Sequence, residues 1–298
     1  LPRINRRYSV ETYERICMKV VKVAAINMDS TSYECNFRCD SILQNFAKGI
    51  NKQLLPASDA ITHSLPLVGR GMSESVGKYI LLSMKNNLPF YHIDTGYFGN
   101  VKRKVWHRIT YNGFQNTNTI VPRDEQRLSQ QLFSYFGQDV EIPLEKKINS
   151  FTPGKKILIC PPSKKVMGFF QQPRPQEWTE KVIKELRQYT DRPIEVRLKP
   201  SRTDRQTVKN MKDALKDDIH CLVTYNSIAA TEALMAGKPA IVLGPNAAQS
   251  ICETDLKNIE NPKIPTQSEM IAFLTHLSYC QFTQTEMYNG FAWKHLQH

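Results

Sequence analysis

The sequence predicts an α/β protein built from two Rossmann-like domains that face a cleft. The first observation is length, because 298 residues exceed what one hydrophobic core usually organises. The second is the alternation of short apolar runs with segments of helical spacing. The third is a polar, proline-containing stretch at 138–156, which separates two such series and is typical of a linker. We expect an N-terminal arm at 1–17, an N-terminal domain with linker at 18–150, and a C-terminal domain at 151–298.

Each element of the first domain follows from its local pattern. Residues 19–27 are rich in valine and alanine and predict a first, parallel strand, whereas residues 35–50 carry apolar side chains at helical spacing. Asn112 and Gly113 provide a turn signal at the end of a later strand. The other expected elements are strands at 59–69, 89–100 and 105–114 and helices at 75–87 and 123–137.

The second domain repeats the alternation after the linker. Residues 175–190 form the clearest helix, because Trp178, Val182 and Leu186 recur on one face. The other expected elements are strands at 155–163, 193–201, 220–226 and 239–245 and helices at 207–218, 227–237, 267–283 and 284–296. Ligands of such sheets bind at the carboxyl ends of the strands, so the residues that follow each strand are the first candidates for a site.

Composition limits the class of protein. Forty basic residues against 28 acidic ones give a net charge of +12, which favours a polyanionic partner or a phosphate-bearing ligand; a solvated basic surface is the alternative. The sequence contains no run of 18 apolar residues, so we expect no membrane span. Seven scattered cysteines without a CxxC pair predict reduced thiols, a cytoplasmic location and no metal site. We expect a monomer or a weak oligomer.

The stretch LVTYNSIAATEALMAGKPAIVLGP, residues 222–245, is the most informative. A strand ends at Tyr225, and Asn226 or Ser227 can cap the helix that follows, so its first N–H groups suit a diphosphate. Glu232, further along that helix, can accept two hydrogen bonds from ribose hydroxyls. The alternative is a well-capped helix whose alanines pack against the sheet.

This stretch resembles the donor site of GT-B glycosyltransferases, in which a Ser/Thr-rich corner precedes an EALxxGKP motif. It is similar to capsule-type transferases and to phage-encoded glycosyltransferases thought to act on modified DNA bases. EVRLKPS and HIDTGYFGN strengthen the resemblance, which spans most of residues 19–298. It implies a nucleotide-sugar donor, a UDP-sugar in our interpretation, bound mainly by the C-terminal domain, with the acceptor over the N-terminal one. Sugar epimerases of the same fold share the motif.

Donor binding is predicted for two groups of residues. Arg197 and Lys199 alternate along a strand, point to one face and can neutralise the phosphates of the leaving nucleotide. An exposed basic loop is the alternative, and the family often has His-Pro where this chain has Lys199-Pro200. The full set of expected donor-binding residues is Arg197, Lys199, Arg202, Asn226, Ser227, Thr231, Glu232 and Asn246. For Asn246, an Asx turn is the alternative.

The candidate catalytic base lies in the first domain. Asp94 ends a strand in YHIDTGYFGN and is the first choice for accepting the proton of an acceptor hydroxyl, with His92 second. A carboxylate that caps its loop through backbone amides is the alternative. Asp94-Thr95-Gly96 is not a DxD metal motif, so we expect a scheme that requires neither a metal nor another cofactor.

A basic run with interleaved aromatics follows Asp94. Such runs suit phosphate contact and base stacking, and a basic loop around a core tryptophan is the alternative. The expected acceptor- or DNA-binding residues are Arg70, Tyr97, Lys102, Arg103, Lys104 and Arg108. We interpret the chain as a glycosyltransferase whose acceptor is a hydroxymethylated pyrimidine in phage DNA, flipped from the duplex if it is paired. A saccharide acceptor, a nucleotide-sugar epimerase and a non-catalytic DNA-binding protein are the rival interpretations.

Overall fold

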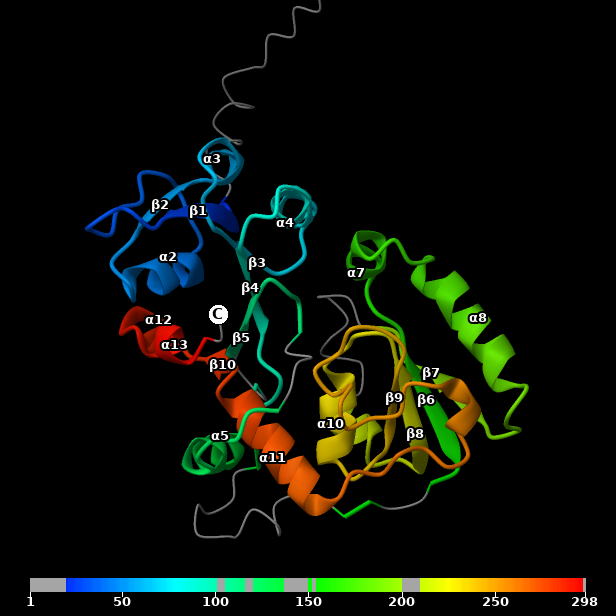
Figure 1. Ribbon diagram of the computed structural model, residues 1–298. Coiled ribbons are helices and arrows are strands. Elements are labelled where there is room, and N and C mark those ends of the chain that lie inside the picture. Colours follow the sequence, from blue (N-terminus) through cyan, green and yellow to red (C-terminus); the bar gives the residue numbers. More distant parts are fainter. Residues whose placement is uncertain are drawn as a thin grey trace, which may run out of the picture.

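Two β-sheets organise the chain, with helices packed on their faces (Figure 1). The two-sheet α/β class predicted from the sequence is confirmed. The computed structural model describes residues 20–100, 105–115, 120–136, 150–151, 154–199 and 210–296. The division at residue 150 stays a prediction.

The first sheet has six strands in the order β10-β5-β4-β3-β1-β2. Its strands are β1 (Val23–Asn27), β2 (Gln53–Pro56), β3 (Leu67–Arg70), β4 (Phe90–Thr95), β5 (His107–Tyr111) and β10 (Gln281–Phe282). Only β3 and β4 pair in parallel; every other neighbouring pair is antiparallel. The expectation that the first strand is parallel is therefore wrong, because β1 pairs antiparallel with both β2 and β3.

Helices cover both faces of the first sheet. Alternate residues of β1 point to opposite faces, so Ala24 and Ile26 join one apolar cluster while Val23 and Ala25 join another. The helices of this half are α2 (Ser41–Lys48), α3 (Ala57–Thr62), α4 (Glu74–Lys85), α12 (Gln284–Tyr288) and α13 (Phe291–His295). Figure 1 shows α2, α12 and α13 on one side of the sheet and α3 and α4 on the other.

The second sheet is parallel throughout, in the order β7-β6-β8-β9. Its strands are β6 (Lys156–Cys160), β7 (Ile194–Val196), β8 (Ile219–Thr224) and β9 (Ala240–Val242). The helices of this half are α7 (Lys164–Phe169), α8 (Pro175–Leu186), α9 (Met211–Ala214), α10 (Ala229–Met235) and the 3-10 turn η2 (Leu256–Asn258). All of β8 is buried, as expected for a central strand covered on both faces.

The C-terminal segment returns to the first sheet. Helix α11 (Gln267–Ser278) packs against α5 (Gln126–Phe136), and the chain then pairs with β5 as strand β10. Helix α12 packs against α2, and the Trp293 indole N–H donates to the Phe46 carbonyl at 2.8 Å. Residues 281–295 therefore lie on the N-terminal sheet, although they come near the end of the sequence (Figure 1).

Several predicted elements need correction. The helix expected at 35–50 is confined to α2, because the chain before Asp40 is extended and Cys35 bridges to Leu54. The strand expected at 59–69 begins as helix α3, and β2 was missed. The helix expected at 284–296 breaks at Gly290, whose φ of 79° lies in the left-handed region.

Candidate functional site

Strand β4 ends at a carboxylate that is held by a buried arginine. Asp94 lies opposite Arg108 of β5 in the antiparallel register. The Arg108 guanidinium donates from Nη2 to Asp94 Oδ2 at 3.2 Å and from Nη1 to the Thr95 carbonyl at 2.8 Å. Only 9% of the Arg108 side chain is exposed, against 36% for Asp94, so the carboxylate is accessible while its partner is not.

The surroundings of Asp94 keep it ionised. Burial raises its pKa, but Arg108, His92, the Thr95 backbone N–H and Lys199 all lower it, and the net pKa lies below the ordinary 3.8. Its Oδ1 accepts from the Thr95 N–H at 2.7 Å, which is the local loop contact that we considered as the alternative to a catalytic role. A carboxylate of low pKa is a weak base, so proton transfer to Asp94 requires a close, oriented hydroxyl.

His92 lies behind Asp94 and is neutral. It is 1% exposed, and its Nε2 lies 3.1 Å from the Gly71 carbonyl, so Nε2 carries the proton and Nδ1 is left as an acceptor. Nδ1 is buried and has no hydrogen-bond partner. The pKa of His92 is lowered to about 4, mainly by burial; Asp94 partly offsets this effect, and Arg108 adds to it. A group this deep contributes electrostatics to the site rather than contact with an acceptor.

A second charged group lies at the carboxyl ends of the parallel sheet. Arg197 follows β7, and its backbone N–H donates to the Ile159 carbonyl of β6 at 2.8 Å. Its charge acts on Glu232 of α10 and on the Cys160 thiol that ends β6, which places the three groups close together. Burial raises the pKa of Glu232 to about 7, against a smaller lowering by Arg197, so this carboxyl is half-protonated near neutral pH.

The corner between β8 and α10 has the side-chain contact expected of a cap at Ser227. Ser227 Oγ accepts from the Ala229 N–H at 3.2 Å, as predicted for a residue that caps the start of this helix. The helix is assigned from Ala229, and Ile228 before it already has a helical conformation. Helix α10 has only seven residues, and one of its first N–H groups is already bonded. The N-terminus of α10 therefore offers an anion fewer free backbone N–H donors than the sequence suggests.

Asn246 closes this corner from the next strand. Its Oδ1 accepts from the Ala248 N–H at 3.0 Å, which is the Asx turn considered as the alternative reading of this residue. Its Nδ2 donates to the Ser227 carbonyl at 3.0 Å, so the β9 loop and the α10 corner are tied together. The Tyr225 ring packs over Gly244, where an added Cβ would lie 2.5 Å from the ring.

The two sheets meet at this edge. Gln115 Nε2, beyond β5, donates to the Asn226 carbonyl of the α10 corner at 3.1 Å, and both residues are buried. The exposed Lys199 adds its charge to Asp94 from the second sheet. Phe114 stacks edge-on against Phe170, at 5.4 Å between centroids. The candidate base is therefore within electrostatic reach of one predicted donor residue, Lys199.

The remaining predicted residues, apart from Thr231, have other partners in the structure or lie outside the described residues. Arg70 pairs with Asp40 at 2.5 Å, and Asp40 also accepts from the Ile42 N–H at the start of α2. Tyr97 is buried, with the Arg108 guanidinium 5.6 Å above its ring. The Thr231 hydroxyl is buried without a hydrogen-bond partner. Lys102, Arg103, Lys104 and Arg202 fall outside the described residues, and DNA contact through Arg70 or Arg108 stays a prediction.

Sequence reasoning missed the residues that support β4. Arg127 of α5 and Gln281 of β10 are buried polar side chains that bond to the loop and strand ends around Asp94. No motif contains them, and their partners lie far away in sequence. Within the described ranges, no cluster of three metal-ligating side chains occurs, and no helix is both long and apolar enough to cross a bilayer.

Comparisons with known proteins find similar solved structures, among them two of KpsC. No protein-family model matches the chain, and no curated protein sequence matches it. KpsC of Thermosulfurimonas dismutans, a beta Kdo 2,7 transferase, is 15% identical over 82% of this chain and 88% of that chain, with a TM-score of 0.47. A second KpsC structure from that organism, a beta Kdo 2,4 transferase, is 13% identical over 72% and 79%, with a TM-score of 0.39.

Proposed function

We propose that this chain is a glycosyltransferase that moves a sugar from a nucleotide-sugar, a UDP-sugar, to a hydroxyl acceptor. The observation that supports the proposal is that the charge of Lys199 reaches Asp94 and lowers its pKa. An ionised, accessible carboxylate at the end of β4 lies within electrostatic reach of a cation at the carboxyl edge of the parallel sheet. That arrangement suits a reaction in which one side takes a proton and the other receives a departing phosphate.

The donor side of the proposal rests on cations and not on a helix end. Arg197 and Lys199 follow β7 and supply positive charge where negative charge grows on the leaving nucleoside diphosphate. Glu232, whose pKa the charge of Arg197 lowers in part, accepts ribose hydroxyls in this proposal when it is ionised. Because α10 is short and its Ala229 amide is bonded, we assign the diphosphate to the cations.

The acceptor side of the proposal rests on Asp94. Its carboxylate takes the proton of the acceptor hydroxyl while that oxygen attacks the anomeric carbon. The bond from this carbon to the diphosphate breaks, and the nucleoside diphosphate leaves with the electron pair. Arg108 keeps Asp94 ionised and fixed, so the reaction depends on a bound hydroxyl held close to the carboxylate.

For the acceptor we propose a hydroxymethylated pyrimidine in DNA. The net charge of +12 and the basic run at 102–108 favour a polyanion. A saccharide acceptor is the rival, and it predicts activity that is indifferent to added DNA and to salt. The panel of donors should include an activated Kdo, because the two similar solved structures are Kdo transferases.

Product analysis by mass spectrometry tests the proposal. The full chain is incubated with a panel of nucleotide-sugars and with modified DNA, unmodified DNA or oligosaccharides. Sugar transfer to any acceptor supports the enzyme class, and transfer to modified DNA alone supports the finer acceptor. Conversion of free donor without an acceptor would indicate an epimerase instead.

Variants locate the chemistry. We expect Asp94→Asn to abolish transfer with donor affinity retained, and Lys199→Ala to weaken donor binding. Lys181→Ala, on the exposed face of α8, removes the same charge away from the site and should leave both unchanged. Equal donor affinity in the Lys199→Ala and Lys181→Ala variants would contradict the assignment of the donor phosphates.

A further inference from the structure

A buried glutamine holds the loop that follows the candidate base. Gln281 of β10 is fully buried, and its Oε1 accepts from the Tyr97 N–H at 2.6 Å and from the Phe98 N–H at 3.3 Å. Its Nε2 donates to the Phe98 carbonyl at 3.2 Å and to Gln131 Oε1 at 2.8 Å. The amide is therefore fully engaged, with three of its four bonds on a loop that is more than 180 residues away in sequence.

Gln281 also shares a row of the sheet with the candidate base. In the antiparallel register, Gln281 lies opposite Arg108, and Arg108 lies opposite Asp94. Residues directly opposite in antiparallel strands project to the same face of the sheet. Asp94, Arg108 and Gln281 thus form one line across β4, β5 and β10, on the face that carries the ion pair.

The loop that contains Tyr97 and Phe98 connects Gln281 to the Arg108–Asp94 pair. The Tyr97 N–H donates the shorter bond to Gln281 Oε1, and the Tyr97 ring lies 5.6 Å from the Arg108 guanidinium that holds Asp94. Gly96 lets Gln281 approach this closely, because an added Cβ would lie 2.7 Å from Gln281 Oε1. Tyr97 and Phe98 also pack into the apolar cluster shared with α5 and α11.

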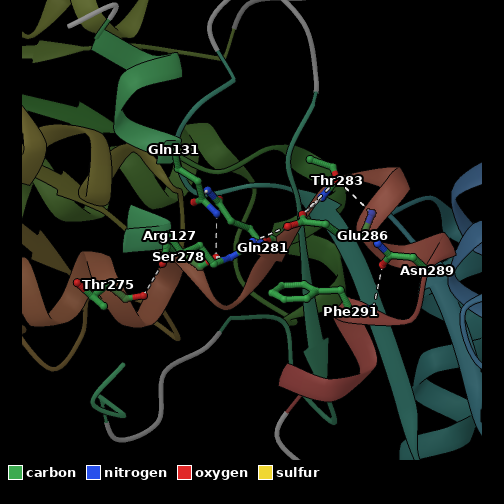
Figure 2. A network of polar contacts seen from close by, with 9 residues as sticks. All are labelled: Arg127, Gln131, Thr275, Ser278, Gln281, Thr283, Glu286, Asn289 and Phe291. Atoms are coloured by element: carbon green, nitrogen blue, oxygen red, sulfur yellow. Dashed lines mark hydrogen bonds and ion pairs between the residues drawn. The ribbon is translucent and has the colours of Figure 1, made fainter. Parts of the chain in front are cut away.

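Gln281 itself is anchored from the helices on either side (Figure 2). Arg127 Nη2 donates to the Gln281 carbonyl at 2.9 Å, and Arg127 Nε donates to the Ser278 carbonyl at 2.7 Å. Gln131 Nε2 donates to the same Ser278 carbonyl at 3.0 Å, and Arg127 also pairs with Glu286 of α12. The side chain has little freedom to move, so the loop that it holds has little freedom either.

We propose that Gln281 is a positioning residue for Asp94: by fixing the Tyr97–Phe98 backbone beneath Arg108, it holds the Arg108–Asp94 pair in the geometry that sugar transfer needs. This inference rests on the function proposed above. The segment after α11 therefore serves the acceptor side of the reaction. In the sequence, however, it belongs to the C-terminal half, which supplies the proposed donor-binding residues.

Loosening the contacts between Gln281 and the loop should raise the pKa of Asp94. The charged and titratable groups that face Asp94 are Arg108 of β5, His92 of β4 and Lys199 beyond β7. Of these, Arg108 contacts the loop held by Gln281, through the Tyr97 ring. A looser loop weakens the Arg108–Asp94 pair, so the pKa of Asp94 moves up toward its ordinary value and the acid limb of the rate profile moves with it.

Two variants of the full chain perturb the line from opposite sides. Gln281→Met keeps the length of the side chain but removes all four hydrogen bonds, whereas Gly96→Ala keeps every polar group and adds a Cβ that clashes with Gln281 Oε1 and with Trp106. Trp293→Phe is the matched control, because it removes one hydrogen bond between the same C-terminal segment and the first half without touching the loop. If Gln281→Met fails to fold, Gly96→Ala decides the question.

The measurements are hydrogen exchange at the Tyr97 and Phe98 amides, an NMR titration of the Asp94 carboxyl, donor affinity and turnover. We expect faster exchange, a raised Asp94 pKa, unchanged donor affinity and a loss of turnover of about tenfold to a hundredfold in both variants. The Trp293→Phe control should match the wild type in all four.

The outcomes separate this inference from the proposed function. Unchanged exchange and an unchanged Asp94 pKa in both variants would overturn the inference even if the wild type is active. Faster exchange with full turnover would also overturn it. A wild type that transfers no sugar from any donor, with an Asp94 pKa that still rises in the variants, would remove the proposed function and leave Gln281 as the group that positions Asp94.

Discussion

Replacing Glu232 by glutamine tests the electrostatics of the proposed donor site through the stability of the protein. Glu232 lies near Arg197 at the carboxyl edge of the second sheet, and its burial raises its pKa from 4.5 to about 7. Glutamine has the same shape and hydrogen-bonding length but never ionises. The substitution therefore removes the cost of a buried charge and leaves the packing of α10 unchanged.

The sign and size of the effect follow from the two pKa values. Below pH 4.5 the carboxyl is protonated in both the folded and the unfolded chain and costs nothing. Between pH 4.5 and about 7 the unfolded chain ionises first, so the free energy of unfolding falls as the pH rises, and above pH 7 the loss is constant. At about 1.4 kcal/mol for each pH unit between the two values, the full loss is about 3 kcal/mol.

Urea denaturation between pH 4 and pH 8.5 measures this difference. We expect wild type and Glu232→Gln to have similar midpoints near pH 4.5 and the variant to be more stable by about 3 kcal/mol at pH 8. Glu180→Gln, on the exposed face of α8, is the control and should follow the wild type throughout. Parallel curves for wild type and Glu232→Gln would refute the reasoning, because Glu232 would then ionise freely in the folded protein.

Three other substitutions test neighbouring parts of the structure. His92→Gln should remove a loss of stability that the wild type suffers as the pH falls from 6.5 to about 4, because in that range the imidazole takes up a proton in the unfolded chain but not in the folded one; acid denaturation curves check this. Arg108→Met should raise the pKa of Asp94 and move the acid limb of the transfer rate to higher pH, and an unmoved limb would show that Arg108 does not hold Asp94. Gly244→Ala should destabilise the protein by about 1–3 kcal/mol in thermal unfolding, because its Cβ meets the Tyr225 ring, and an unchanged midpoint would show that the corner yields.

Local patterns predicted the elements that carry the site, but not how the sheets are assembled. Strand β4 was predicted because PFYHIDT is an apolar run between turn residues, and Asp94 was chosen because it ends that strand. The antiparallel pairing of β1 was not predictable, because valine- and alanine-rich strands occur in both kinds of sheet. Strand β10 was missed because it has only two residues and its Phe282 continues the apolar spacing of α11.

The site shows the same division. Arg197 and Glu232 were identified from two separate motifs, and in the structure the charge of Arg197 lowers the pKa of Glu232. Arg108 was predicted as an acceptor contact because it belongs to a basic run, but its guanidinium is turned toward Asp94, a pairing that only the β4–β5 register reveals. Gln281 has no sequence signal at all, because its role comes from contacts that close the chain over more than 180 residues.

A crystal structure of the full chain with a bound nucleotide-sugar would test the central claim most directly. We predict that the diphosphate contacts Arg197 and Lys199 and that the anomeric carbon of the sugar faces Asp94. A diphosphate bound away from the carboxyl edge of the second sheet, or a sugar that points away from β4, would contradict it.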